Sequence, residues 1–364
     1  MTKRDSNILK CVAILLMLAH HLFMYADQPD FPALVYGPLL NTPARLAAFG
    51  QLSKLCVTIF VFVTAYGTTM RYQGDGMMDA RAIMASSTRR WVKLLASFQL
   101  VYIIAFALCP LGGKSWFTLY SPSRLENLVF AFFDFMGVSF ITNLPSYNSS
   151  WWYMSLAVTF IFVMPLLIKL CRRYGFFVLL PEILLVRWLN VQWVIYRYLL
   201  PAMMGILMAE YDVIERVWTA YRKACLPSKA LACVGMLTVL GLGSVLWLRA
   251  GDGLLDIYET VLLVPVCFLT LLTLARIPGL NKAAEWIGRH SMNIFFFHAF
   301  IYQNWFHNFT YSLRYPVLIF LFLLGSTLLF SVAVEGLKKL LHFDRLVARL
   351  SDWACRLLLP KESV

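Results

Sequence analysis

Residues 8–25 read ILKCVAILLMLAHHLFMY, an apolar run that follows the charged residues Lys3, Arg4 and Asp5. As a helix rising about 1.5 Å per residue, this run spans about 27 Å, which is about long enough to cross the roughly 30 Å hydrocarbon core of a bilayer. No small-residue cleavage site follows it, so we expect a retained first helix rather than a signal peptide. The N-terminus is then predicted to be cytoplasmic.

The rest of the chain repeats this pattern. The 364 residues are 60% hydrophobic and only 14% charged, with a mean hydropathy of +0.69. One soluble core cannot hide so much apolar surface, and a helix is the element that satisfies its own backbone in lipid. We therefore predict an all-α, polytopic membrane protein with about ten transmembrane helices and both termini cytoplasmic. The expected spans are 8–25, 46–70, 91–110, 151–170, 176–189, 191–209, 230–248, 257–274, 291–306 and 316–336.

The expected domain organisation is simple. Residues 1–337 form a single transmembrane domain, and residues 338–364 form a basic cytoplasmic tail. The apolar stretch 128–140 is short, carries Asp134 and has polar loops on both sides, so it is predicted to be a re-entrant or interfacial helix on the outer face. The spans 176–189 and 191–209 are interrupted by charged and polar residues, so we expect this hairpin inside the protein rather than against lipid. These residues are Glu182, Arg187, Gln192 and Arg197.

The net charge of +13 has a topological explanation. With a cytoplasmic N-terminus, roughly 24 of the 32 Lys and Arg residues fall on the cytoplasmic side, as the positive-inside rule requires. Nucleic acid is therefore excluded as a partner. The eight cysteines are scattered singly without metal-ligand spacing, so they are predicted to be small apolar residues of helices, and no metal site is expected.

Ionisable groups inside a span are costly and therefore mark candidate functional sites. In the first helix, Lys10 and His21 are eleven residues apart, which at about 100° per residue places both side chains on one face, roughly 16 Å apart along the axis. Lys10 would then be a cation near the cytoplasm and His21 an imidazole deeper in the membrane. A second interpretation stays open, in which Lys10 extends to the cytoplasmic surface and His21 lies at the outer interface.

Basic residues also mark the entrance of the third span. Arg90 and Lys93 are one helical turn apart, and Arg89 precedes them. Such a group suits the binding of phosphate or a similar anion from the cytoplasm. Orientation of the helix by positive charge explains the same residues.

Two further stretches carry candidate site residues. His298 lies about two turns into the span 291–306, where it is either functional or a packed, hydrogen-bonded core histidine. Asn148 and the aromatic residues Trp151, Trp152 and Tyr153 form the outer entrance of another span. Aromatic belts at the membrane surface explain these rings, and so does a platform on which a sugar stacks.

Taken in order, these features resemble the acyltransferase-3 family of multipass membrane acyltransferases. The family has a basic residue, ten intervening residues and a histidine in its first helix, and Lys10 and His21 stand at that spacing. An Arg-x-x-Arg pair follows the second span in the family, and Arg90 and Lys93 resemble it. Lys10 and Lys93 replace the usual arginines, which keeps the charge but loses the bidentate fork.

The resemblance continues through the second half of the chain. A Trp-Phe-Leu-Ser entrance followed by a proline is similar to residues 152–155 and Pro165. A Ser-x-x-x-Tyr-Leu-x-His element is similar to residues 291–298, with Phe295 in place of the tyrosine. Where the family usually has Phe-Ser-Gly, residues 63–67 read VTAYG.

The resemblance implies a membrane O-acyltransferase that moves an acyl group from cytoplasmic acyl-CoA to a hydroxyl of a cell-surface or exported glycan, in the cell (plasma or inner) membrane. Acetyl is the expected group, with succinyl as the alternative, and acyl-CoA is the expected co-substrate. His21 is expected to be the general base or a transient acyl carrier, with Lys10 as its electrostatic partner and His298 as a second acid/base group. The expected CoA-binding residues are Arg89, Arg90 and Lys93, and the expected acceptor-binding residues are Asn148, Trp151, Trp152 and Tyr153.

Two other functions compete with this one. Ten helices with buried His and Arg also suit an exporter of polysaccharides or lipid-linked sugars, although no inverted repeat and no pair of Gly/Pro-broken helices is evident. A sensor or structural membrane protein is a third alternative, but it leaves the intramembrane ionisable groups without a role. The sequence does not indicate an oligomeric state.

Overall fold

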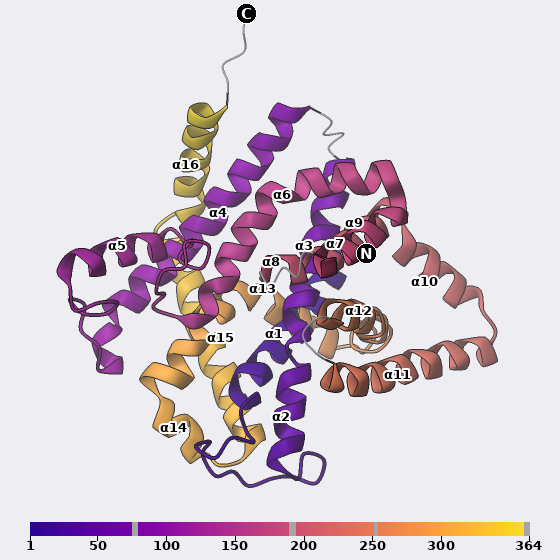
Figure 1. The fold of residues 1–364 in the computed structure, drawn as a ribbon, viewed down its shortest axis with the longest axis horizontal. Helices are drawn as coiled ribbons and strands as arrows, with labels where there is room; N and C mark the ends of the chain where they lie inside the picture. The colour runs from indigo at the N-terminus through magenta and orange to yellow at the C-terminus, as the bar shows by residue number, and fades with distance from the viewer. Residues whose placement is uncertain (75–78, 189–193, 251–253, 360–364) are drawn as a thin grey trace, which may run out of the picture. The chain divides into compact units, whose positions relative to one another are not determined.

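The structure is a computed structural model that describes residues 1–74, 79–188, 194–250 and 254–359. The described residues are mostly helical and contain no strand, which confirms the all-α prediction. The elements are α1 (Lys3–Phe23), α2 (Pro43–Leu52), α3 (Leu55–Gly74), α4 (Ala80–Ala107), η1 (Cys109–Gly112), α5 (Arg124–Phe135), η2 (Ser149–Trp151), α6 (Trp152–Tyr174), η3 (Gly175–Val178), α7 (Leu179–Trp188), α8 (Val194–Arg197), α9 (Leu199–Glu210), α10 (Val213–Lys223), α11 (Leu226–Arg249), α12 (Leu255–Leu272), α13 (Leu280–Ala299), η5 (Phe300–Trp305), α14 (His307–Ser312), α15 (Pro316–Leu340) and α16 (Phe343–Leu358) (Figure 1).

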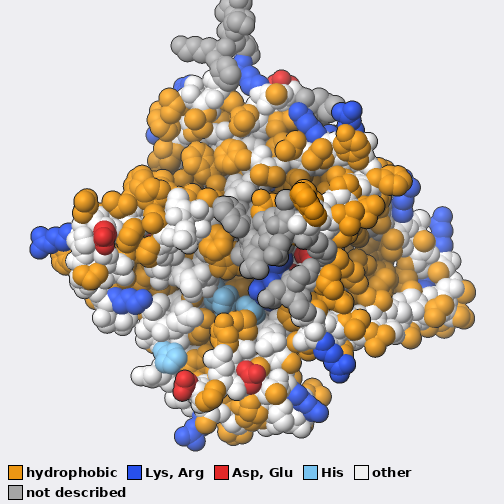
Figure 2. Space-filling view, in the orientation of Figure 1, with side chains coloured by type: hydrophobic (Ala, Val, Ile, Leu, Met, Phe, Trp, Pro, Cys, Tyr) orange, Lys and Arg blue, Asp and Glu red, His pale blue; other side chains and the backbone are white. Residues whose placement is uncertain are grey.

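The described residues contain seven helical stretches long and apolar enough to cross a membrane. They are Lys3–Phe23, Pro43–Gly74, Ala80–Ala107, Ser149–Val186, Leu226–Arg249, Leu255–Leu272 and Pro316–Leu340. Hydrophobic side chains are spread over much of the face shown in Figure 2, and many large ones are more than one-third exposed. A surface of this kind is typical of a protein whose solvent is lipid.

The chain forms two compact units, each made of two separate segments. Unit 1 contains Met1–Gly76 and Leu166–Ser291, and unit 2 contains Met77–Pro165 and Met292–Val364. Helices α6 and α13 each contribute residues to both units.

In unit 1, α3 packs closely against α9 and α1. The contact with α9 requires a glycine, because a Cβ at Gly205 would lie 2.7 Å from the backbone oxygen of Phe62. The core around this contact includes Leu9, Tyr66 and Leu263, and α11 lies against α12 at its margin. Small residues of this kind allow the close helix contacts found in membrane proteins.

A buried ion pair joins two segments of unit 1. Arg197 of α8 donates to both carboxylate oxygens of Glu259 in α12, and Thr58 of α3 donates to Oε2 of the same carboxylate at 3.0 Å. The Glu259 side chain is 2% exposed. A charge at such a position needs a partner and additional hydrogen bonds, and this carboxylate has both.

Unit 2 is built around an aromatic core. The ring of Phe98 lies 4.8 Å from that of Trp151 and 5.4 Å from that of Phe296, and Trp151 lies 5.4 Å from Phe300. These distances are typical of edge-to-face aromatic packing. The core therefore joins α4, the start of α6, α13 and the π-helix η5.

Asp134 of α5 holds the segment that leads into α6. Its carboxylate accepts hydrogen bonds from the Tyr120 hydroxyl at 2.7 Å, the Ser146 hydroxyl at 2.7 Å and the Tyr147 backbone N–H at 2.8 Å. Burial raises the pKa of Asp134 above its usual range, and these hydrogen bonds oppose the rise only in part. The short α5 agrees with the prediction that 128–140 is not an ordinary span.

The predicted spans differ from the helices at several points. The expected span 46–70 is divided between α2 and α3, which are separated at Ser53 and Lys54. The hairpin expected inside the protein is buried at α9, whereas Leu184 and Leu185 of α7 are more than half exposed. The start of the predicted span 191–209 and Gln192 lie outside the described residues, as does the last residue of the span 176–189.

Candidate active site

Helix α1 carries Lys10 and His21 on partly exposed positions, and its start is fixed by a capping box between Thr2 and Asp5. Thr2 Oγ1 accepts from the Asp5 backbone N–H, and Asp5 accepts in return from the Thr2 N–H. Three apolar residues of α1 between Lys10 and His21, Ala13, Ile14 and Leu18, are fully buried. At about 100° per residue, Ile14 and Met17 share the face of Lys10 and His21 and are buried, so the two polar groups are partly exposed positions on a face that is otherwise packed.

His20, which sequence reasoning did not select, is the more buried of the two neighbouring histidines. Its Nδ1 lies 2.8 Å from the backbone oxygen of Gly50, to which it donates in the neutral tautomer that keeps Nδ1 protonated. A Cβ at Gly50 would lie 2.6 Å from the backbone nitrogen of Met24, so only glycine permits this approach of α2 to the end of α1. His20 thus anchors α2. The ring of His21 lies 5.1 Å from the ring of His20.

The basic entrance of α4 belongs to unit 2. Arg89 is exposed and lies 3.6 Å from Asp352 of α16, an exposed pair of small energetic value. Arg90 is partly buried and Lys93 is exposed. The three side chains therefore differ in accessibility, and Arg90 is the least exposed of them.

The polar and aromatic side chains at the entrance of α6 are hydrogen-bonded and packed against other parts of unit 2. Oδ1 of Asn148 accepts from the Ser150 N–H at 2.9 Å and caps η2, and Asn148 is 3% exposed. Nε1 of Trp151 donates to the Phe296 oxygen at 3.3 Å. The ring of Tyr153 lies 5.4 Å from that of Phe295, and Trp152 lies 6.1 Å from Phe140.

His298 meets this entrance directly. Its Nδ1 lies 2.6 Å from the Phe295 backbone oxygen, one helical turn earlier, and Nε2 lies 3.4 Å from the hydroxyl of Ser150. Donation from Nδ1 to the carbonyl leaves Nε2 as the acceptor for the hydroxyl. The structure therefore joins two stretches that the sequence presented separately, the entrance at 148–153 and the element 291–298.

Ser150, the Asp134 network and the Arg197–Glu259 pair were missed as contacts by sequence reasoning. Nothing in the local sequence distinguishes Ser150 from the serine beside it, because its contact, His298, lies 148 positions away. Glu259 had a signal, since it is a carboxylate near the start of an apolar run. Asn293 also has a polar role, donating to Ser331 at 3.1 Å and to Glu335 at 2.8 Å.

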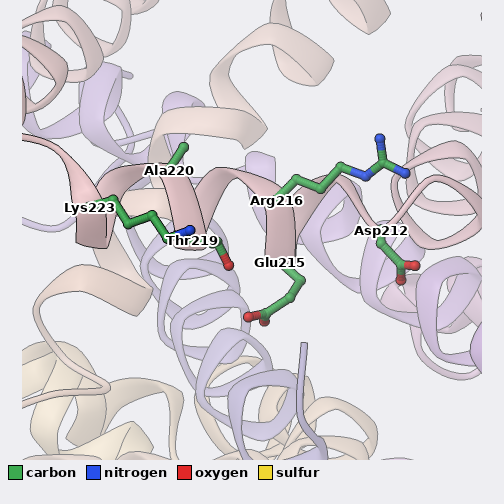
Figure 3. Close-up of a pocket in the computed structure, with 6 residues that line it drawn as sticks. All are labelled: Asp212, Glu215, Arg216, Thr219, Ala220 and Lys223. Atoms are coloured by element: carbon green, nitrogen blue, oxygen red, sulfur yellow. The ribbon is translucent and has the colours of Figure 1, made fainter.

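A surface hollow lies on α10, and none of the candidate site residues selected from the sequence lines it. Asp212, the residue before α10, and five residues of that helix line it (Figure 3). The hollow is open to its surroundings and contains both acidic and basic side chains, so no single ligand charge is favoured. We assign it no part in catalysis.

The comparison with known families decides between the alternatives. A family model described as an acyltransferase domain matches residues 4–336. The chain belongs to the acyltransferase-3 family. No curated protein and no solved structure matches it. An acyltransferase-3 protein with these apolar helices is a multipass membrane acyltransferase.

The side chains of this acyltransferase offer imidazoles, hydroxyls and cations for acyl transfer. Among the described residues, no group of three or more His, Cys, Asp or Glu side chains is arranged to hold a metal ion. The two imidazoles with a candidate role lie in different units, His21 on α1 and His298 on α13. The chemistry that these groups support is the deprotonation of a hydroxyl and the stabilisation of negative charge.

Proposed function

We propose that this protein is an O-acyltransferase that moves an acyl group, acetyl in the first place and succinyl as the alternative, from cytoplasmic acyl-CoA to a hydroxyl of a cell-surface or exported glycan. The observation that supports it most strongly is the family match over residues 4–336. The membrane is proposed to be the plasma or inner membrane, and both termini are proposed to be cytoplasmic by the positive-inside rule. Residues 1–337 are the proposed catalytic domain, and 338–364 its basic tail.

The reaction requires a base. The acceptor hydroxyl attacks the thioester carbonyl, the C–S bond breaks, and the hydroxyl proton passes through the base to the departing CoA thiolate. We assign His21 as this base, or as a transient acyl carrier, because it is the partly exposed imidazole of α1 whereas His20 is bound to Gly50. Lys10 is its electrostatic partner on the same helix, and His298 is assigned as a second acid/base group.

The donor and the acceptor need separate anchors. Arg89, Arg90 and Lys93 are proposed to bind the CoA phosphates, since all three lie within the first half of α4 and two of them are exposed. Asn148, Trp151, Trp152 and Tyr153 are proposed to bind the glycan acceptor. Their aromatic rings can stack on the apolar C–H faces of a sugar.

The deciding experiment is binding and turnover of radiolabelled acetyl-CoA by the purified protein in liposomes with a glycan acceptor. We compare the wild type with His21→Ala and Arg90→Ala, and use Arg216→Ala on exposed α10 as the matched control for loss of one cation. His21→Ala is expected to keep CoA binding and to lose at least 100-fold in transfer, the order of magnitude of a general base. Arg90→Ala is expected to weaken CoA binding, and Arg216→Ala to change neither.

The opposite result is equally informative. If the folded wild type binds neither acetyl-CoA nor succinyl-CoA, the donor assignment is wrong, and export of a polysaccharide or lipid-linked sugar becomes the better hypothesis. If transfer occurs but His21→Ala retains it in full, the reaction class stands and the assignment of the base is wrong.

A further inference from the structure

Helix α16 starts where a membrane-spanning candidate ends. Helix α15 ends at Leu340 with Lys338 and Lys339 in its last turn. Two residues, Leu341 and His342, separate it from the start of α16 at Phe343. His342 adopts a left-handed backbone with φ of 48°, which turns the chain between the two helices. Because Lys residues at a helix end mark the membrane surface, α16 begins at that surface.

One side of α16 is covered by α4 (Figure 1). The buried residues of α16 are Phe343, Val347, Ser351, Ala354 and Cys355. Cys355 Sγ lies 3.8 Å from the Ala85 oxygen, and Asp352 lies 3.6 Å from Arg89, so the two helices run antiparallel. The side of α16 that carries these buried residues therefore accounts for its packing within unit 2.

A second apolar stripe of α16 remains exposed. Leu346, Leu350, Trp353 and Leu357 are 51%, 40%, 58% and 66% exposed. Their spacing of four, three and four residues places them on one face, adjacent to the buried side at about 100° per residue. The apolar arc of α16 is thus about twice as wide as the part that α4 covers.

Three arginines border the exposed stripe. Arg345, Arg349 and Arg356 are all exposed and share one face of the helix, next to the stripe on its other edge. The acidic residue on the same side, Asp352, faces Arg89. An apolar stripe beside a row of arginines, on a helix of low net hydrophobicity, is typical of a helix that binds an anionic membrane surface.

We propose that α16 is a membrane-surface helix that binds anionic phospholipids of the bilayer. The stripe of Leu346, Leu350, Trp353 and Leu357 enters the boundary between headgroups and acyl chains. The arginine row binds the headgroup phosphates, for which its planar guanidinium groups are well suited. The continuity of α16 with α15 and its arginine row favour lipid over a second copy of the chain or a soluble partner.

The test uses the full chain in nanodiscs. Cys225 is the exposed cysteine among the eight, so a Cys225→Ser background allows selective labelling of an added cysteine. Leu350→Cys places a fluorophore on the exposed stripe, and Ala348→Cys, also an exposed position, places it on a different face as the matched control. The discs contain phosphatidylcholine alone or with phosphatidylglycerol, and a fraction of the lipids carries a quencher in the acyl chain.

We expect the label at 350 to be quenched several-fold more strongly than the label at 348, and the quenching to increase with phosphatidylglycerol. Replacing Arg345, Arg349 and Arg356 by Gln should remove the increase while leaving the thermal unfolding midpoint unchanged. Equal quenching at 348 and 350, or insensitivity to the three substitutions, would overturn the proposal. Disulfide-linked dimers of Leu350→Cys without quenching would instead assign the stripe to contact between copies.

Discussion

Individual polar side chains decide how the outer entrance of α6 is held. Asp134 accepts three hydrogen bonds, from Tyr120, Ser146 and the Tyr147 N–H. Its replacement by Ala leaves these buried donors without their acceptor, and we expect a loss of the order of 3 kcal/mol in unfolding free energy. Asp134→Asn should lose much less unfolding free energy. Its side-chain carbonyl still accepts a hydrogen bond, and its amide N–H can donate to the Ser146 hydroxyl. Thermal unfolding in detergent distinguishes the two variants.

The same residue predicts a dependence of stability on pH. Burial raises the pKa of Asp134 in the folded state, so the folded chain binds this proton more tightly than the unfolded chain. Its stabilising contribution is complete below the unfolded pKa of about 3.9 and is lost as pH rises through the folded pKa. As the pH is raised from acid to neutral, the unfolding midpoint of the wild type should therefore fall relative to that of Asp134→Asn. A constant difference between the two proteins would exclude Asp134 as the source.

The buried pair of Arg197 and Glu259 gives a second test at this scale. Replacing Glu259 by Gln leaves the guanidinium without its charge partner, and removal of one member of a buried pair costs about 3–5 kcal/mol. Replacing Arg197 by Met and Glu259 by Leu together should restore much of the stability, because no buried charge then remains. A double mutant as unstable as the two single mutants combined would show that the pair contributes more than charge neutralisation.

At the scale of elements, the contact between α1 and α2 depends on the absence of a side chain. Gly50→Ala would place a Cβ within 2.6 Å of the Phe23 carbonyl carbon and the Met24 nitrogen. We expect a loss of about 1–3 kcal/mol from this overpacking, measured by thermal or denaturant unfolding. The control is Gly67→Ala in α3, where a Cβ meets nothing within 4 Å, and where the helix should be unaffected or slightly stabilised. Equal effects of the two substitutions would contradict the close approach.

Most of the long helices could be predicted from the sequence, because long apolar runs have few alternatives to helices in lipid. The break at Ser53 and Lys54 was not predicted, since two polar residues beside an apolar run do not distinguish a break from a continuous helix. Helix α13 begins at Leu280, eleven residues before the predicted span, because its charged first half lacks the apolar composition that marks a span. Composition identifies the apolar part of a helix and not its full length.

The candidate site was predictable as residue types but not as contacts. Lys10, His21 and His298 were selected because ionisable groups are rare in apolar runs. The bond between His20 and Gly50, and that between Ser150 and His298, depend on helix packing across 30 and 148 positions. Nothing local in the sequence separates His20, which anchors α2, from its neighbour His21.

At the scale of the whole molecule, topology is testable through one thiol. Cys225 is exposed, and its hydrogen bond with the Ser228 hydroxyl at 3.2 Å lowers the pKa of the thiol. We expect a membrane-impermeant maleimide to modify Cys225 first among the eight cysteines, and only from the cytoplasmic face, where neighbouring Arg222, Lys223 and Lys229 place it. Labelling of right-side-out and inverted vesicles, with Cys225→Ser as the control, measures how fast Cys225 reacts and from which face it is reached. Modification from the outer face would reverse the proposed orientation.

The π-helix η5 has a consequence for how the sequences of relatives should be compared. It extends over Phe300–Trp305, directly after α13 and His298, and a π-turn holds one more residue than an α-turn. Deleting one residue between 300 and 305 would restore an ordinary helix and rotate everything downstream by about 100° relative to His298. In a relative that lacks the extra residue, the chain after His298 would be rotated, and a different side chain would lie where Trp305 stacks on Phe300.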